Sequence, residues 1–338
     1  MDMKITVAFF FMLFCDAAVS QTIVPLTSGT NTSIRGLSVV NDSVAWVSGS
    51  NGWSARTTDG GKNWKWLQIK GYEKFDFRDI EAFSAGKAIV VNAGSPAVIL
   101  LTADGGDTWK EVYRNSSPHI FLDGMDFWNA DAGIVYGDPI GGILQLFKTN
   151  DGGKTWIDIS HKNRNTLIEG EASFAASGTN IRTLMDGECW IATGGTQSRI
   201  FYSPDYGDTW RVYPCPIIQG SSSTGPFSIA FRSVTNGVAA GGDYLRDTVT
   251  TNNFLITRDG GKTWAAPVTK PFGYRSSVEF ITEDHLVATG TSGTDISVDG
   301  GRTWNNISPE GFHVVRRAKS GKLLLLSGSN GRIACLRF

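Results

Sequence analysis

The sequence predicts an all-β fold, a seven-bladed β-propeller of four-stranded blades, from three observations. An eight-residue motif occurs six times, with its aspartate at positions 59, 104, 151, 205, 259 and 299. These intervals fit a four-stranded propeller blade better than the shorter solenoid repeats. The chain has 40 glycines and 11 tryptophans but only 19% charged residues, a composition typical of short strands and tight turns. Finally, strand-like segments at the two ends complete a last blade.

The repeated motif is TTDGGKNW in its first copy, residues Thr57 to Trp64, and follows the pattern Ser/Thr-x-Asp-x-Gly-x-Thr/Asn-Trp. A carboxylate can accept hydrogen bonds from nearby backbone N–H groups and close a turn, and glycine permits left-handed backbone angles. The tryptophan then enters the next strand, where its ring can be buried between blades. The motifs resemble the Asp-boxes of bacterial neuraminidase repeat propellers. Six copies indicate a structural role for Asp59, Asp104, Asp151, Asp205, Asp259 and Asp299.

Each blade can be placed from its motif, because turn residues separate short β-prone segments. The expected strands of the first blade are Arg35–Val40, Val44–Ser48, Trp53–Thr57 and Asn63–Leu67. Those of the second are Phe77–Phe83, Ala88–Asn92, Val98–Thr102 and Thr108–Val112. No segment has the periodicity of a long amphipathic helix.

The ends of the chain decide the number of blades. After the sixth motif come three strand-like segments without a motif, Phe312–Lys319, Lys322–Ser327 and Arg332–Phe338. Near the start, Thr22–Leu26 resembles a fourth strand without partners. Pairing the N-terminal strand with the three C-terminal strands completes a seventh blade and removes exposed edges. Six or eight blades are the alternatives.

The first twenty residues predict a signal peptide, because the apolar run Ile5–Phe14 is followed by the small residues of Ala18-Val19-Ser20. We expect cleavage before Gln21 and export to the periplasm or the extracellular space, with residues 21–338 forming a single propeller domain. The apolar run is shorter than the roughly 20 residues of a membrane-spanning helix. Three cysteines remain, of which at most two can form a bridge: Cys189, Cys215 and Cys335.

Composition and motif content exclude several classes of function. The net charge is −1, without basic runs, so no nucleic-acid partner is expected. The four histidines lack metal-ligand spacing, and no glycine-rich turn joins a strand to a helix. We therefore expect no metal, no cofactor and no catalytic residues.

Insertions concentrate on one face of the predicted ring, which commonly marks the binding side of a repeat protein. They form the links and loops at 137–142, 161–179, 194–199, 216–225 and 241–253. Arginines near the starts of the inner strands of blades one, two, four and six are predicted to ring the mouth of the central channel. Blades three, five and seven have Asp123, Ser228 and His313 there. The candidate partner-binding residues are Arg35, Arg78, Arg182, Arg275, Arg199, Glu171, Asp138 and Asp243. Their alternative role is that of solvated rim charges.

The segment Phe77-Arg78-Asp79-Ile80-Glu81-Ala82-Phe83, an apolar strand, a glycine-containing loop and then TADGGDTW resemble the photosystem II stability/assembly factor propellers. The resemblance extends over the mature chain and implies a seven-bladed propeller without catalytic activity. It also implies that an arginine-bearing face holds a partner protein, which makes Arg35, Arg78, Arg182 and Arg275 contact residues. We expect a monomeric, exported, assembly-factor-like binding protein.

The alternative is a sialidase-like or other glycoside hydrolase, or a glycan-binding propeller, because sialidases also contain Asp-boxes. Sialidase chemistry needs an arginine triad for the substrate carboxylate and a Tyr–Glu nucleophile pair. Tyr244 and Glu171 are candidates for that pair. The sialidase signature Phe/Tyr-Arg-Ile-Pro is absent, and Ile34-Arg35-Gly36-Leu37 takes its approximate place.

Overall fold

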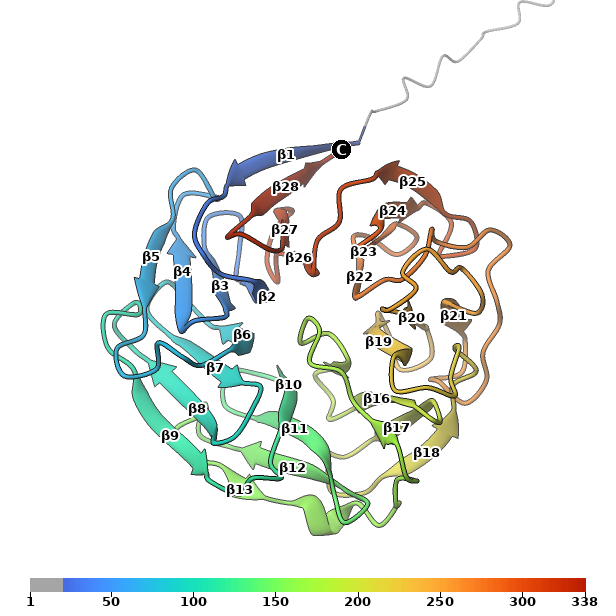
Figure 1. Cartoon of the computed structure of the whole chain (residues 1–338), viewed down its shortest axis with the longest axis horizontal. Helices are drawn as coiled ribbons and strands as arrows, with labels where there is room; N and C mark the ends of the chain where they lie inside the picture. Colours follow the sequence, from blue (N-terminus) through green and yellow to red (C-terminus); the bar gives the residue numbers. More distant parts are fainter. Residues whose placement is uncertain (1–20) are drawn as a thin grey trace, which may run out of the picture.

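Seven antiparallel β-sheets are arranged as blades around a central axis (Figure 1). The computed structural model describes residues 21–338, so the predicted signal peptide lies outside the described residues. The blades follow one another around the ring in chain order. The predicted seven-bladed all-β propeller is therefore confirmed.

The first three blades each contain four strands, numbered from the axis outward. Blade one consists of β2 (Ile34–Val39), β3 (Ala45–Gly49), β4 (Trp53–Thr57) and β5 (Lys65–Gln68). Blade two consists of β6 (Phe77–Ala82), β7 (Ala88–Asn92), β8 (Ala97–Thr102) and β9 (Lys110–Asn115). Blade three consists of β10 (Leu122–Phe127), β11 (Gly133–Ile140), β12 (Ile143–Thr149) and β13 (Ile157–Asp158), followed by the 3-10 turn η1 (Ser160–Lys162).

Blades four and five depart from the regular pattern, and blade six returns to it. Blade four consists of β14 (Glu171–Ala172), β15 (Ile181–Thr183), β16 (Cys189–Gly195), β17 (Arg199–Ser203) and β18 (Arg211–Pro214). Blade five consists of β19 (Thr224–Phe231), β20 (Gly237–Asp243) and β21 (Phe254–Thr257). Its outer strand is reduced to the bridge Ile256↔Ala265, and the nearby Pro267 has no N–H to extend the pairing. Blade six consists of β22 (Ser277–Phe280), β23 (Leu286–Gly290), β24 (Gly293–Ser297) and β25 (Asn305–Ser308).

The seventh blade joins the two ends of the described chain. It consists of β26 (Val314–Arg317), β27 (Leu324–Ser327), β28 (Ile333–Arg337) and the N-terminal strand β1 (Thr22–Thr27). Strand β1 pairs antiparallel with β28, from Thr22↔Arg337 to Thr27↔Ile333. This pairing is the predicted closure of the ring, and it covers the edge that β28 would otherwise expose.

The Asp-box turns have the hydrogen bonds that their side chains predict. In the first, the Asp59 carboxylate accepts from the Asn63 backbone N–H at 2.9 Å, and the Thr57 hydroxyl accepts from Gly61 N at 2.9 Å. The indole of Trp64 donates to the Gly61 carbonyl at 3.1 Å. In the fourth copy Tyr206 occupies a glycine position with φ of 59°. The same turn therefore forms even where one glycine is missing, because its hydrogen bonds come from the Thr or Ser hydroxyl, the Asp carboxylate and the backbone.

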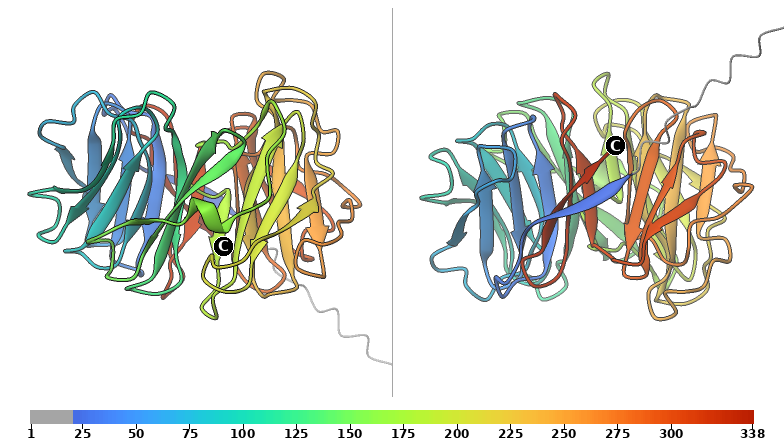
Figure 2. Two further views of the ribbon diagram at one scale, coloured as in Figure 1. Left: turned by 90° about the horizontal axis from the view of Figure 1, so that it is seen from below. Right: turned by 90° about the horizontal axis from the view of Figure 1, so that it is seen from above.

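Each Asp-box also defines one face of the ring. The N–H of Gly60 donates to the carbonyl of Ser43, in the turn between the first two strands of the same blade, at 2.9 Å. We call this side the box face, and the side with the inter-blade links and second-to-third-strand loops the loop face. The side views show these connections at opposite ends of the upright strands (Figure 2).

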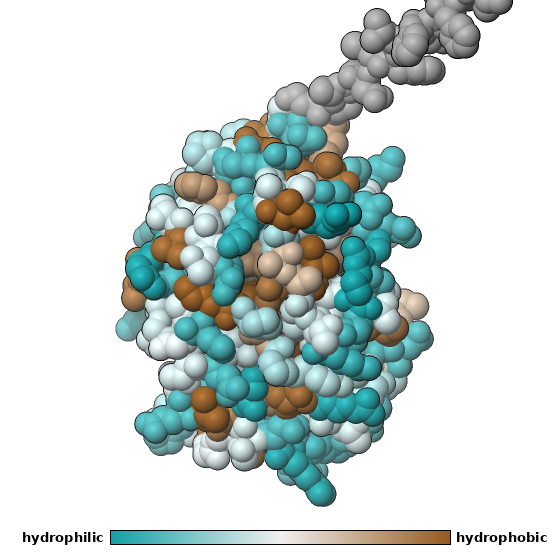
Figure 3. All heavy atoms as spheres, turned by 90° about the vertical axis from the view of Figure 1, so that its right-hand side faces the viewer, coloured by the Kyte–Doolittle hydropathy of each residue, from teal (hydrophilic) through white to brown (hydrophobic). Residues whose placement is uncertain are grey.

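The hydrophobic core lies between adjacent blades, where neighbouring sheets pack face to face. Trp46 and Trp190 are among its largest buried side chains. The outer wall around blades five and six mixes hydrophilic residues with small apolar patches (Figure 3). Within residues 21–338, no helix has the length and apolar character needed to cross a membrane.

Candidate functional site: a cavity at the loop face

The loop face opens into a cavity of about 410 Å³ at the ring axis. Its walls come from several blades and combine cationic with aromatic side chains. We call it the loop-face cavity, and define it by Arg35, Arg78, Asp138, Phe174, Phe227, Tyr244, Tyr274 and His313.

The floor of this cavity is an insertion that folds into the centre of the ring. Residues 173–180, between β14 and β15, reach the axis (Figure 1, light green) and are mostly buried. The Ser177 hydroxyl donates to the Ser276 carbonyl of blade six at 2.7 Å, and the Thr179 hydroxyl bonds Ser228 of blade five at 2.7 Å. We call residues 173–180 the channel plug. Part of the insertion predicted as the link at 161–179 therefore enters the channel and ties blades together.

Two arginines hold the plug from the opposite side of the ring. Arg35 Nη1 donates to the carbonyl of Ala176 at 3.0 Å, and Arg78 Nη1 donates to that of Ala175 at 3.4 Å. Arg78 also donates from Nε to Asp76 Oδ2 at 2.7 Å. Both arginines lie at a register shift where their inner strand begins, between Ile34 and Gly36 in one case and between Phe77 and Asp79 in the other. The irregular backbone directs both side chains to the channel mouth.

Aromatic rings form one wall of the cavity. Phe174 of the plug stacks on Phe227 with ring centroids 3.9 Å apart. Phe227 meets Tyr274 edge to face at 4.8 Å, and Tyr244 at 6.0 Å. Tyr244 is 47% exposed, so part of this aromatic wall is accessible to a ligand.

The ionisable groups make the cavity attractive to anions. Burial, followed by repulsion from Arg35, Arg332 and Arg78, lowers the pKa of His313 to about 3, so its imidazole is neutral at pH 7. Burial raises the pKa of Asp138, whose carboxylate oxygen accepts from the Ser173 N–H at 2.9 Å. Arg35 and Arg78 therefore face a cavity in which burial disfavours the ionised form of Asp138, and Arg78 is paired with the carboxylate of Asp76.

A second buried carboxyl group, that of Asp123, interacts electrostatically with Asp138 and Arg78 of the cavity. Asp123 is 1% exposed, and neither of its side-chain oxygens has a hydrogen-bond partner among the described residues. Burial, followed by repulsion from Asp138, raises the pKa of Asp123 well above its ordinary value. Asp123 therefore contributes little negative charge to offset the two arginines.

Arg182 does not join the other candidates, and its predicted position at the channel mouth is wrong. It pairs with Trp190, further along its inner strand than Arg35 and Arg78 on theirs. Its Nη2 lies 3.1 Å from Glu279 Oε2, in a separate cavity of about 540 Å³ at the box face. The strand register gives the reason: Arg182 pairs with Trp190 as Ser38 pairs with Trp46 in blade one, so Arg182 corresponds to Ser38 and not to Arg35.

The predicted position of Arg275 at the channel mouth is also wrong. Its side chain is wholly buried, and its Nε donates to Asp295 Oδ2 at 2.6 Å. Its Nη1 donates to the Tyr274 carbonyl and the Ser292 hydroxyl, each at 2.8 Å. This arginine stabilises blade six and presents no donor to the cavity.

The remaining candidates form local ion pairs outside the cavity. Arg199 Nη2 lies 2.5 Å from Glu171 Oε2, and the Glu171 side chain is fully buried. Asp243 accepts from Arg246 Nε at 2.7 Å. Arg35, Arg78 and Asp138 are thus the predicted residues that the structure brings together.

The structure does not assemble the Tyr–Glu pair that a sialidase would need. Glu171 Oε1 accepts from Thr193 Oγ1 at 2.5 Å and from Arg199 Nε at 2.8 Å. Tyr244 lines the loop-face cavity, and no hydrogen bond joins it to Glu171 within residues 21–338. In the same part of the chain, no three or more His, Cys, Asp or Glu side chains form a group that could hold a metal ion. Cys189, Cys215 and Cys335 are buried and unbridged.

Sequence reasoning missed the aromatic wall. Phe174 lies in a long insertion, Phe227 lies at the register shift within the inner strand β19, and Tyr274 lies just before the inner strand β22. An aromatic residue inside an otherwise small and polar insertion, as in Ser173-Phe174-Ala175-Ala176-Ser177, was the available signal that this segment enters the ring.

Comparison of the sequence with known proteins finds two similarities. Residues 17–118 match the family described as "Photosynthesis system II assembly factor YCF48". The chain is 23% identical over 291 residues to the "Photosystem II assembly lipoprotein Ycf48" of Synechococcus sp. (strain CC9902), covering 76% of this chain and 82% of the relative. The resemblance to the photosystem II assembly factor propellers is therefore confirmed.

Solved structures show the same fold. "YCF48 bound to D1 peptide" superposes with a TM-score of 0.67 at 15% identity, covering 94% of this chain and 97% of that one. "YCF48 from Cyanidioschyzon merolae" gives a TM-score of 0.65 at 16% identity, covering 94% and 99%. The Niastella koreensis GH74 enzyme gives 0.59 at 16% identity, covering 93% of this chain but only 53% of the enzyme. Both binding proteins and a larger enzyme thus use this architecture.

Proposed function

We propose that the chain is an exported, non-catalytic propeller of the assembly-factor type that holds a polypeptide segment in the loop-face cavity. The observation that carries the proposal is Arg35. It lies at the channel mouth, and no carboxylate within residues 21–338 forms an ion pair with it. A bound segment that brings a carboxylate to Arg35 would supply that partner, and an arginine fork suits a carboxylate.

The aromatic wall supports a ligand that carries apolar side chains. Phe174, Phe227 and Tyr244 offer rings that can pack on apolar side chains, while Tyr244 keeps a polar end in solvent. A cavity of about 410 Å³ accommodates a few side chains of an extended segment but not a folded domain. An acidic peptide with apolar neighbours therefore fits better than a neutral sugar.

The similar proteins support a polypeptide ligand. One of them is titled as bound to a D1 peptide, and the curated relative is a photosystem II assembly lipoprotein. A glycosidase is the competing function, because the GH74 enzyme has the same fold. The separation of Tyr244 from Glu171 weighs against it.

The test places a photo-crosslinking amino acid at position 244, where the half-exposed side chain borders the cavity. We expect crosslinking to one polypeptide of the exporting cell, with crosslinks at its acidic segment. Arg35→Glu combined with Arg78→Glu should abolish the crosslink, and rising salt should weaken it. The matched control is Arg211→Glu, which reverses an exposed arginine on the outer strand β18 and should change nothing.

Two results would reject the proposal. One is crosslinking that survives the double arginine reversal in a correctly folded protein. The other is turnover on a panel of sialosides and plant glucans, which would make the chain a glycosidase.

A further inference from the structure

The cavity that contains Arg182, about 540 Å³ in volume, lies at the box-face end of the central channel. Five of its charged residues occupy one register position of the inner strands, the second pair counted from the turn between strands one and two. They are Glu81, Asp126, Arg182, Glu279 and Arg316. All five line the cavity, which we call the box-face cavity, so they form a ring of charges around the channel.

The charges of this ring balance one another. Arg182 and Arg316 share the carboxylate of Glu279, with nitrogen–oxygen distances of 3.1 and 3.5 Å. Lys319, which also lines the cavity, pairs with Glu81. With the remaining carboxylate of the ring, that of Asp126, three cations meet three carboxylates. This inner network therefore gives no reason by itself to expect a ligand.

Two further arginines in the lining, Arg232 and Arg317, exceed this balance. Arg232 Nη1 lies 3.9 Å from Glu283 Oε2, and the Glu283 side chain is 92% exposed, so this pair is weak. Arg317 Nη2 donates to the Gly321 carbonyl at 2.9 Å, and Arg317 forms no ion pair within residues 21–338. The lining thus has five cations and three carboxylates, a surplus of two positive charges.

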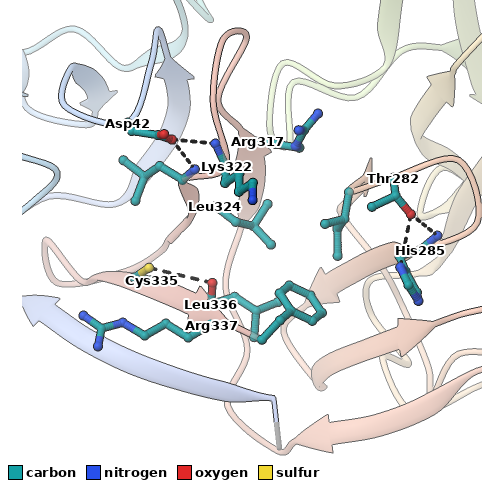
Figure 4. A pocket seen from close by; sticks show the side chains of 12 residues that line it. Asp42, Thr282, His285, Arg317, Lys322, Leu324, Cys335, Leu336 and Arg337 are labelled. Carbon is teal, nitrogen blue, oxygen red and sulfur yellow. Dashed lines mark hydrogen bonds between the residues drawn. The ribbon is translucent and has the colours of Figure 1, made fainter. Parts of the chain in front are cut away.

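Asp42 does not neutralise Arg317 either. Both residues line a neighbouring cavity of about 660 Å³ between blades six and seven, which is drawn in Figure 4. The Asp42 Oδ1 accepts from the N–H groups of Lys322 at 2.5 Å and Leu323 at 2.7 Å. Figure 4 shows the carboxylate facing these donors and the Arg317 side chain apart from it. The guanidinium of Arg317 therefore keeps its full charge for a ligand.

Phe280 of blade six stands between the two surplus arginines around the ring. Arg317 has in blade seven the register position that Phe280 has in blade six, and Arg232 follows the residue at that position in blade five. All three residues line both the box-face cavity and an adjoining recess of about 470 Å³. We call Arg232, Phe280 and Arg317 the rim site. It places a half-buried aromatic ring between two guanidinium groups.

The chemistry of the rim site suits two carboxylates on a short apolar body. A guanidinium group offers a planar fork of donors that matches a carboxylate. Two carboxylates carry the two negative charges that the surplus balances, whereas two phosphate groups would bring about three to four. The two recesses have the volume of small-molecule sites and are too small for a folded domain.

We infer that the rim site binds a small dicarboxylate, with one carboxylate on Arg232, the other on Arg317 and the connecting carbon chain over Phe280. The inner network of the box-face cavity supplies a floor that is neutral overall. The rim site lies on the box face, opposite the loop-face cavity, so this binding is independent of the proposed function.

The test titrates the protein by calorimetry with straight-chain dicarboxylates from succinate to suberate, at constant ionic strength. We expect one molecule bound per chain and an affinity that passes through a maximum at one chain length, because two fixed arginines hold the carboxylates at one separation. A monocarboxylate of that length should bind roughly tenfold or more weakly, because it loses a charge-assisted pair of hydrogen bonds.

Variants of the rim site decide which residues hold the ligand. Arg317→Gln should weaken the best dicarboxylate by roughly tenfold or more and remove the dependence on chain length. Arg317→Lys keeps the charge without the fork, so it should bind with intermediate affinity. Arg211→Gln, on the exposed part of β18, is the matched control and should bind like the wild type.

Two further measurements keep the result separate from folding and from the loop face. The Nε–H NMR signals of Arg232 and Arg317 should both shift with the best dicarboxylate in the wild type, which requires no variant. The double reversal Arg35→Glu/Arg78→Glu should leave dicarboxylate binding intact, so that failure of the proposed function and failure of this inference are distinguishable.

Four results would overturn the inference. They are an absence of saturable binding, equal binding of mono- and dicarboxylates, and unchanged binding to a folded Arg232→Gln/Arg317→Gln variant. The fourth is tighter binding of a capped peptide with two aspartates than of any dicarboxylate, because the rim site would then hold a polypeptide.

Discussion

Arg275 and Asp295 form an ion pair in which both side chains are at most 1% exposed, with Arg275 Nε 2.6 Å from Asp295 Oδ2. Asp295 also accepts from the Asn306 side chain at 3.0 Å and from Phe272 N at 3.1 Å. The pair joins the start of the inner strand of blade six to β24. The ion pair therefore stabilises the blade, although the sequence position of Arg275 had predicted a contact residue.

Replacing Arg275 alone should destabilise the protein severely. Arg275→Met leaves Asp295 buried without its cation, so we expect the free energy of unfolding to fall by about 3–5 kcal/mol. Arg275→Met combined with Asp295→Leu should recover part of that loss, because no lone charge remains. Urea denaturation of the two variants measures the difference. Wild-type stability with lost partner binding would instead return Arg275 to the binding surface.

The buried hydroxyl group of an Asp-box gives a second prediction about stability. Thr257 is 1% exposed; its hydroxyl accepts from Gly261 N and donates to Asp259 Oδ1, both at 2.9 Å. Thr257→Val keeps the shape but leaves the buried Gly261 N–H without an acceptor, which should lower the free energy of unfolding by about 1–3 kcal/mol. Thr263→Val, at the exposed end of the same turn, is the matched control and should cost less. Equal costs would show that burial of the hydroxyl is not the cause.

Ring closure gives a third prediction. Deleting residues 21–27 removes β1 and exposes the full edge of β28. We expect a lower melting temperature and concentration-dependent self-association, because an unpaired edge strand can pair with another chain. Light scattering and thermal melts check both. A truncated monomer that melts like the parent would mean that β1 contributes little to closure.

The sequence was sufficient for the architecture because the repeated features are local. Thr57, Asp59 and Gly61 lie within five positions, so their turn could be predicted from side-chain chemistry alone. Closure was predictable as well, since three strands at one end needed the strand at Thr22–Thr27.

The candidate site was harder, because it depends on contacts between distant segments. Arg182 has the register position of Ser38 rather than that of Arg35, and the long insertion before β15 hides this alignment in the sequence. Nothing local in residues 173–180 determines that Ser177 meets Ser276 or that Arg35 meets Ala176, pairs separated by 99 and 141 positions.

His313 gives the last prediction, a pH dependence with a defined sign. Its Nε2 lies 2.9 Å from Ser329 Oγ and 3.2 Å from Ser33 Oγ, and its pKa falls from 6.5 to about 3 mainly through burial. Between these values the unfolded chain binds a proton that the native state excludes. The contribution of neutral His313 to the free energy of unfolding is therefore complete above pH 6.5. It is lost as the pH falls below that value. From pH 7.5 to 5 the loss should be about 2 kcal/mol.

The variant His313→Gln separates this titration from all others, because glutamine can keep one serine contact without binding a proton. The difference in unfolding free energy between wild type and variant should change by that same amount from pH 7.5 to 5. Arg35→Met should raise the pKa of His313 toward its ordinary value, since it removes a nearby positive charge. An acidic peptide bound beside Arg35 should raise it too, and NMR titration of the imidazole measures both. A His313 signal that titrates near pH 6.5 in the free wild type would contradict the burial on which this prediction depends.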